Sequence, residues 1–243
     1  MPDAPFFSVI IPTYNRKHTI GATLESVARQ TFRDFETLVV DDGSSDGTAE
    51  LVRKQFPWVQ VIHQENAGPG AARNRGADIA RSKYLAFLDS DDLWFPWTLE
   101  KCHLALQSLG SPSYATLQPF VFDTLDDIEN VGQAALEYRI FDDYFETHQQ
   151  WICHGSGASL ILRNLFVDVG GFASGNINCE DADLAMRLGT TPGFLHILSP
   201  PLIAYRQHSQ NVSHDIHKTK AGIDLLLDRE RNGEYPGGTQ RVN

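Results

Sequence analysis

The first 110 residues alternate between short apolar runs and segments with helical periodicity. The apolar runs have the length of strands, are rich in branched or aromatic residues, and lie at 6–11, 37–40, 59–63 and 84–88. Between and after them, apolar residues recur at helical spacing, which predicts helices at 17–30, 46–55, 71–81 and 95–109. Strands separated by helices of this length form a mostly parallel, twisted sheet with flanking helices. This half of the chain therefore predicts an α/β layer of the nucleotide-binding type.

The second half of the chain has a less regular pattern. Residues 111–150 mix short apolar pieces with acidic residues and predict no clear element. The clearer elements are helices at 180–188 and 218–231 and strands at 194–198 and 202–205. The end of the chain, 233–243, is polar and predicts a disordered tail. Since no linker divides the rest, we expect one domain over 1–232 with two functional halves, 6–110 and 111–232.

Charge and composition narrow the classes of partner. The formal net charge of the 243 residues is -11 and the isoelectric point is about 5.2, so we expect no nucleic-acid partner, because a nucleic-acid groove needs basic stripes. An anionic substrate would need a metal or a local Arg/Lys cluster to offset this charge. The three cysteines lack CxxC spacing and predict neither a disulfide framework nor a zinc site, which fits a cytoplasmic protein. We expect no signal peptide and no membrane span.

A cluster of acidic residues follows the last strand of the first half. Asp89, Asp91 and Asp92 come directly after the run 84–88, and such crowded carboxylates repel one another unless a cation neutralises them. Hard oxygen ligands suit Mg²⁺ or Mn²⁺, which are commonly completed by substrate phosphates. An acidic turn that caps the next helix explains these residues equally well. The cluster alone does not decide between these two interpretations.

The other three strand ends also carry candidate ligands. Pro12, Thr13 and Tyr14 follow the first strand, and the tyrosine ring offers a face on which a base can stack. Asp41 and Asp42 follow the second strand, where one carboxylate could accept a hydrogen bond from the imide N–H of uracil or thymine. The third strand leads to a glycine-rich turn and a helix that carries Arg73 and Arg75, an arrangement typical of an anion site. A solvated helix face is the alternative interpretation of these arginines.

Five stretches together resemble the family 2 glycosyltransferases, which have the GT-A fold. They are SVIIPTYNR (8–16), TLVVDDGSSDGT (37–48), NAGPGAARNRG (66–76), YLAFLDSDD (84–92) and EDADLAMRL (180–188). The resemblance implies a nucleotide-binding half (6–110) and an acceptor-binding half (111–232). It also implies that a sugar is moved, with inversion, from a nucleoside diphosphate to a hydroxyl acceptor such as a glycan or a lipid-linked sugar. The expected cofactor is Mg²⁺ or Mn²⁺, and family habit favours a UDP-sugar.

The resemblance also assigns roles to residues. Thr13, Tyr14, Asp41 and Asp42 would line the base pocket, and Pro12 would also belong to the nucleotide-binding residues. Arg73 would lie near the nucleotide, and Asp89 would contact the ribose or the surroundings of the metal. Asp91 would be the main metal ligand, with Asp92 beside it. Asp181 would be the general base that takes the proton of the acceptor hydroxyl. Glu180 and Asp181 are also acids of the kind that a helix start favours.

Further residues in the second half match the family less sharply. His208 resembles a downstream histidine that would help bind the metal or the diphosphate, although a lone histidine is more often structural. Gly155 and Ser156 lie where the acceptor-side loop is expected, and Glu180 is assigned to the same acceptor or donor-sugar side. The QxxRW motif of processive members is absent. Peripheral contact with the inner face of a membrane is compatible with a lipid-linked acceptor.

Three other functions remain open at this point. Asp89 and Asp91 also resemble the nucleophile loop of haloacid-dehalogenase-like phosphatases, although that loop normally follows the first strand of its domain. A catalytically inactive glycosyltransferase-like binding protein would keep the same motifs. A nucleotidyltransferase would be expected to carry a glycine-rich triphosphate loop after the first strand, and residues 11–19 do not form one.

Overall fold

The computed structural model describes residues 4–108, 110–150, 152, 155–175, 177–207 and 215–238. Its main sheet has the strand order β3-β2-β1-β4-β9-β6-β10-β8. These strands are β1 (Phe7–Thr13), β2 (Phe35–Asp41), β3 (Gln60–His63), β4 (Tyr84–Phe87), β6 (Tyr114–Leu117), β8 (Glu137–Phe141), β9 (Ser159–Leu162) and β10 (Phe194–Ser199). β1 to β4 are mutually parallel, and β6 is parallel to β10, whereas β9 and β8 run antiparallel to their neighbours. The mostly parallel sheet predicted from the sequence is therefore confirmed.

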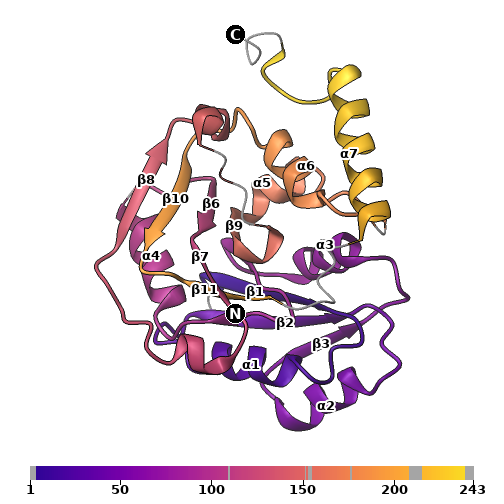
Figure 1. Cartoon of the computed structure of the whole chain (residues 1–243), viewed down its shortest axis with the longest axis vertical. Helices are drawn as coiled ribbons and strands as arrows, with labels where there is room; N and C mark the ends of the chain where they lie inside the picture. The colour runs from indigo at the N-terminus through magenta and orange to yellow at the C-terminus, as the bar shows by residue number, and fades with distance from the viewer. Residues whose placement is uncertain are drawn as a thin grey trace.

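Helices cover both faces of the sheet (Figure 1). One face packs against α1 (Ile20–Ala28), α2 (Thr48–Gln55) and α4 (Thr98–Ser108), through apolar residues that include Leu24, Val52 and Leu99. The other face packs against α3 (Pro69–Ile79), α5 (Arg163–Asp168) and α6 (Glu180–Arg187), through Ala77, Phe166 and Leu184. Burial on both faces explains why β1 and β4 are fully buried and read as continuous apolar runs.

A second, three-stranded sheet joins the two halves of the chain. Its order is β5-β11-β7, formed by β5 (Leu93–Trp94), β11 (Ile203–Arg206) and β7 (Pro119–Phe122). β11 is antiparallel to β5 and parallel to β7. Because β5 begins directly after the aspartates at 89–92, this sheet attaches the acidic cluster to strands from the second half.

The remaining elements are short 3-10 turns and a long helix near the end of the chain. The turns are η1 (Leu125–Ile128), η2 (Tyr144–Gln149) and η3 (Ser156–Ala158), and the helix is α7 (Ile216–Arg231). α7 lies beside α6, at the periphery of the molecule (Figure 1). Tyr235, in the segment expected to be a disordered tail, is 4% exposed. No helix among the described residues combines the length and hydropathy needed to cross a bilayer.

Several elements differ from the sequence prediction. β1 continues through Pro12 to Thr13 instead of ending at the proline. The carbonyl of Ile10 accepts a hydrogen bond from Leu88, and Pro12 lies two residues further along that side, beyond the last β1–β4 pair. The absence of a backbone N–H on Pro12 therefore removes no hydrogen bond between β1 and β4. Residues 111–150, for which no element was predicted, form β6, β7 and β8.

Candidate active site

Three residues form a row across the carboxyl ends of neighbouring strands. Thr13 on β1 is paired in register with Asp41 on β2, which is paired with His63 on β3. Oδ2 of the fully buried Asp41 lies 2.8 Å from Nδ1 of His63. Asp41 Oδ1 and Thr13 Oγ1 are buried without a hydrogen-bond partner in the described part of the chain. Since an unsatisfied buried polar atom is costly, this strand-end row has acceptor capacity left for a ligand or water.

The loops after β1 and β2 are linked to each other. The backbone N–H of Asn15 donates to Ser44 Oγ at 2.9 Å, and Asn15 Oδ1 accepts from the N–H of Ser45 at 2.9 Å. Asn15 has a positive φ of 52°, a conformation that asparagine tolerates better than most residues. Two further hydrogen bonds join residues 16 and 17 to the side chains at 48 and 46. Tyr14 remains 49% exposed on the surface of this linked pair of loops.

Asp42 holds the loop that leads into α3. Its carboxylate accepts hydrogen bonds from Gln64 Nε2 and from the backbone N–H groups of Ala67 and Gly68, at 2.7 to 2.9 Å. Gly68 has a positive φ of 91°, and Pro69 follows as the first residue of α3, a position that favours proline. The carboxylate of Asp42 thus supports the loop on which Arg73 depends, whereas one oxygen of Asp41 has no partner among the described residues.

Arg73 connects the two halves of the site. It is 4% exposed, donates to Asp89 Oδ1 at 2.6 Å, and donates through its other terminal nitrogen to Glu180 Oε1 at 2.8 Å. The guanidinium lies 5.3 Å from the ring centroid of Phe172. Burial alone would lower the pKa of Arg73, but the two carboxylates raise it. Burial also raises the pKa of Glu180, although Arg73 acts in the opposite direction.

Two hydrogen bonds, each between a side chain and a backbone group, fix the acid loop (residues 89–92) to β11. Asp92 is 2% exposed, and its Oδ1 accepts from the N–H of Arg206 at 2.8 Å, while Arg206 Nε donates to the carbonyl of Asp91 at 2.9 Å. Burial and the neighbouring Asp89 and Asp91 raise the pKa of Asp92 well above its usual value. The Asp91 carboxylate lies 3.4 Å from Arg16 Nε. Negative charge is therefore concentrated at this loop, where Arg16 and Arg206 lie against it.

Glycines allow the loop at 155–157 to approach the acids Asp89 and Asp181. A Cβ on Gly157 would lie 2.8 Å from Asp89 Oδ2, and one on Gly155 would lie 3.7 Å from Asp181 Oδ2. Gly155 also has a positive φ of 81°. Ser156 Oγ donates to Glu180 Oε1 at 3.3 Å. The structure thus brings Gly155, Ser156, Glu180 and Asp181 close together, next to Asp89.

Behind Asp181, a buried charge cluster fastens α6. Asp183 is fully buried and accepts hydrogen bonds from Arg187 and Arg229 at 2.7 Å and from the Tyr235 hydroxyl at 2.9 Å. Arg187 also donates to the carbonyl of Val169 at 2.6 Å. This Asp183 cluster (Asp183, Arg187, Arg229 and Tyr235) ties α6 to α7 and to the end of the described chain. The sequence pattern did not predict it.

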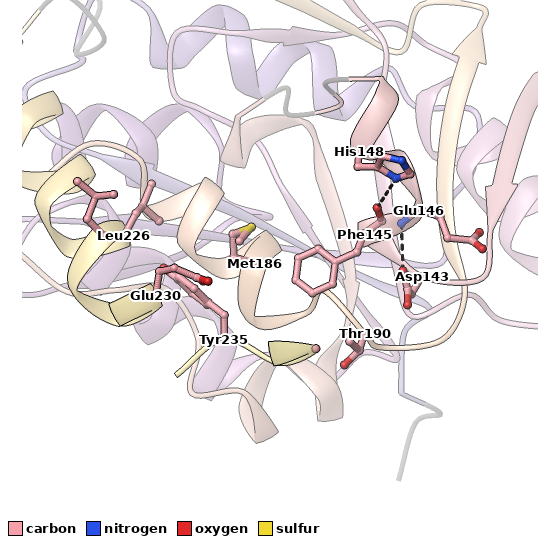
Figure 2. A pocket seen from close by; sticks show the side chains of 11 residues that line it. Asp143, Phe145, Glu146, His148, Met186, Thr190, Leu226, Glu230 and Tyr235 are labelled. Atoms are coloured by element: carbon pink, nitrogen blue, oxygen red, sulfur yellow. Dashed lines mark hydrogen bonds between the residues drawn. The ribbon is translucent and has the colours of Figure 1, made fainter. Parts of the chain in front are cut away.

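A separate hollow of about 750 Å³ lies at the other end of α6. Figure 2 shows Leu226 and Glu230 of α7 across from Phe145 of η2, with Met186 of α6 between them. None of the residues predicted for the site lines it, so we place the candidate site at the strand ends and not in this hollow.

The donor set at the acid loop fits a hard divalent cation that is completed by substrate. Among the described residues, no three His, Cys, Asp or Glu side chains are grouped as a ready-made metal site. Mg²⁺ is commonly held by one or two carboxylates together with phosphate oxygens. Asp91 and Asp92 offer such oxygens, and burial, followed by the charges of Asp89 and Asp91, raises the pKa of Asp92. His208 lies outside the described residues.

Residues missed by the sequence analysis complete the site. They are Asn15 and Arg16 in the first loop, His63 at the end of β3, and Arg206 at the end of β11. His63 was detectable in principle, because it ends the third strand as Asp41 ends the second. The Arg206 contacts join residues more than 100 positions apart, a separation at which local pattern carries no signal.

Comparison with known proteins finds a similar fold and similar sequences. Staphylococcus aureus TarS residues 1–349, in the structure with UDP-GlcNAc, superposes with a TM-score of 0.77 at 20% identity, covering 97% of this chain and 69% of that one. A Haemophilus influenzae protein described as an uncharacterized glycosyltransferase is 28% identical over 228 residues, 91% of this chain and 76% of its own length. The Escherichia coli enzyme WfgD, named as a UDP-Glc:alpha-D-GlcNAc-diphosphoundecaprenol beta-1,3-glucosyltransferase, is 41% identical over 95 residues, 38% of each chain.

The family model described as glycosyl transferase family 2 matches residues 8–171. This range includes the strand-end row, the linked loops, Arg73, the acid loop and the acceptor-side glycines. The fold is the GT-A fold expected from the sequence, and the chain belongs to glycosyl transferase family 2.

Proposed function

We propose that this glycosyltransferase moves a sugar from a nucleoside diphosphate, UDP being favoured, to a hydroxyl acceptor with inversion. The observation that carries the proposal is the bridge made by Arg73 between Asp89 and Glu180. It brings the nucleotide-side acid loop next to the acceptor-side pair Glu180 and Asp181. A donor that binds along the strand ends would therefore present its sugar to Asp181.

The proposed chemistry is a single displacement at the anomeric carbon of the donor sugar. The acceptor oxygen attacks the anomeric carbon on the face opposite the diphosphate, the bond from that carbon to the phosphate oxygen breaks, and the nucleoside diphosphate leaves. Asp181 takes the hydroxyl proton as the new bond forms. Arg73, held by Asp89 and Glu180, keeps the two sides in fixed geometry, which favours an aligned attack.

Mg²⁺ or Mn²⁺ would be held by Asp91, with Asp92 beside it, and would supply positive charge to the diphosphate. Asp92 and Arg206 hold the acid loop in place from the side of β11. Arg16, 3.4 Å from Asp91, adds a second positive group at this position. These positive groups would offset the repulsion between an anionic donor and a chain of net charge -11.

Two relatives support the substrate classes. The solved complex of TarS contains UDP-GlcNAc, and the name of WfgD specifies a UDP-glucose donor and a lipid-linked sugar acceptor. We accordingly propose a UDP-sugar donor and an acceptor that is a glycan or a lipid-linked sugar, used in the cytoplasm or at the inner face of a membrane. A screen of nucleotide sugars that measures released nucleotide tests the donor.

Two substitutions separate binding from chemistry. Asp91→Asn should weaken UDP binding in the presence of Mn²⁺ about tenfold, since one charged metal ligand is lost, whereas Asp181→Asn should leave UDP binding unchanged and abolish transfer. Calorimetry with UDP and a sugar-transfer assay measure the two effects. Asp78→Asn on the exposed side of α3 removes the same charge away from the site and serves as the control.

The outcomes also distinguish the alternatives. Full transfer activity in Asp181→Asn would refute the assignment of the base. A wild-type protein that binds UDP but releases no nucleotide from any donor would favour the inactive binding protein. Membership of a glycosyltransferase family excludes the haloacid-dehalogenase-like phosphatase, and the ion pair between Asp89 and Arg73 leaves that carboxylate poorly placed as a nucleophile.

A further inference from the structure

The strand-end row contains a histidine for which the proposed transfer has no role. The His63 side chain is 58% exposed, whereas the Asp41 carboxylate that it contacts is fully buried. The two residues are direct register partners on parallel strands, with Nδ1 of the ring 2.8 Å from Oδ2. The exposed His63 ring thus contacts the buried Asp41 carboxylate and occupies one of its two oxygens.

The other oxygen of this carboxylate has no partner in the part of the chain that the structure describes. Asp41 Oδ1 has no hydrogen bond within the described residues, and neither does Thr13 Oγ1 on the adjoining strand. An ionised carboxylate only accepts hydrogen bonds. Once His63 holds Oδ2, the carboxylate is fixed in one rotamer and offers Oδ1 as a single acceptor at the strand ends.

We propose that His63 is a positioning residue which, through Asp41, selects nucleotides whose base carries a ring N–H donor. This inference rests on the proposed nucleotide site and identifies what reads the base there. Uracil presents its imide N–H to Oδ1, whereas cytosine presents an unprotonated ring nitrogen, which repels a carboxylate. Discrimination arises because an acceptor that faces an acceptor leaves both groups unpaired.

The matched probes are UDP and CDP, which differ only in the base edge. Calorimetry of the full chain with Mn²⁺ should show that His63→Ala weakens UDP binding by about three- to tenfold and CDP binding hardly at all, since one hydrogen bond that orients the acceptor is lost. His63→Asn, whose side-chain amide can replace Nδ1, should restore most of the preference for UDP. In transfer assays, His63→Ala should raise the KM for the donor and leave kcat unchanged.

Two further variants keep the test decisive. Asp41→Asn should remove the preference for UDP altogether, and His217→Ala, an exposed histidine at the start of α7, should change nothing. If Asp41→Asn binds UDP as the wild type does, the proposed base pocket is wrong. If Asp41→Asn loses the preference while His63→Ala and His63→Asn keep it, the role of His63 alone is overturned. An equal loss of UDP and CDP binding in His63→Ala, without rescue by asparagine, would also overturn it, because that result indicates general damage.

Discussion

At the scale of single residues, Arg73 is the side chain on which most of the site depends. It is buried, and two of its nitrogens each bind a different carboxylate, one from each half of the chain. A planar guanidinium can hold two acids at fixed angles, whereas a lysine ammonium is a point charge on a flexible stem. The ring of Phe172 further limits the positions that the guanidinium can take.

Arg73→Lys should therefore lower kcat/KM for transfer by about 10- to 100-fold, because a single ammonium cannot hold both acids in the geometry that the guanidinium gives them. Steady-state kinetics at saturating acceptor measure the effect. Arg75→Lys, the same change two residues away on the exposed side of α3, is the matched control and should behave like the wild type. Equal kinetics for the two variants would contradict the bridging role.

The residues of the site could be found from the sequence more readily than their pairings. The positions of Asp41, Arg73, Asp89 and Asp181 follow from strand ends and from the ordered motifs. The contact between Arg73 and Glu180 spans 107 residues, so it depends on how the two halves of the chain fold against each other. Likewise, the sequence predicts the same kind of role for Asp41 and Asp42. Only their hydrogen bonds in the structure show that Asp41 pairs with His63 and that Asp42 holds the loop before α3.

At the scale of elements, α6 is held from behind by the Asp183 cluster. The Asp183 carboxylate binds two arginines and one tyrosine, so α7 and the chain around residue 235 both support the helix whose first turn carries Asp181. Gly222 lets α7 pack directly on the backbone of Asn178, since a Cβ there would overlap its carbonyl oxygen. Tyr235 lies in a polar, glycine-rich segment that resembles a disordered tail, which explains why the sequence did not reveal it.

Removing the centre of this cluster should destabilise the fold. Asp183→Ala should lower the free energy of unfolding by about 3 to 5 kcal/mol, because it leaves two arginines without their shared acid. Tyr235→Phe removes one hydrogen bond and should cost about 1 kcal/mol. Urea unfolding followed by circular dichroism measures both effects. A Tyr235→Phe variant as unstable as Asp183→Ala would contradict the ranking.

Elements of the first half were also easier to predict than those of the second. β1 to β4 and their helices follow one another along the chain, so local periodicity reflects their environment. β6 pairs with β9 and β10, and β7 pairs with β11, all from distant segments. β8 lies at the edge of the main sheet with mostly exposed side chains, so it lacks the apolar pattern of a buried strand.

At the scale of the whole molecule, ion pairs join segments that are distant in sequence and make stability depend on pH. Glu36, at the start of β2, accepts from the Ser8 hydroxyl at 2.6 Å and from the Arg81 guanidinium at 2.7 and 2.9 Å. Burial acts to raise the pKa of Glu36, but these hydrogen bonds and the charge of Arg81 outweigh it and lower the pKa. The ionised carboxylate is therefore favoured in the folded state.

The pKa of Glu36 is lower in the folded protein than in the unfolded one. Its contribution to the stability of the fold is therefore fully present above its ordinary pKa of about 4.5, and it is lost as the pH falls through the lower pKa of the folded state. Glu36→Gln should thus lower the Tm at pH 7 by a few degrees, and the difference from the wild type should shrink below pH 4.5. Thermal unfolding at several pH values tests this. Glu25→Gln, in an exposed pair with Arg29, is the control and should show little effect.

The linked loops after β1 and β2 constrain how this enzyme can be re-engineered or diversify. Residues 13–17 and 42–48 exchange hydrogen bonds through backbone and side-chain groups on both sides. A graft that transplants one loop from a relative breaks these bonds and misplaces Tyr14. Substitutions in the two loops should therefore be strongly epistatic, and nucleotide preference should transfer between relatives only when both loops move as one cassette.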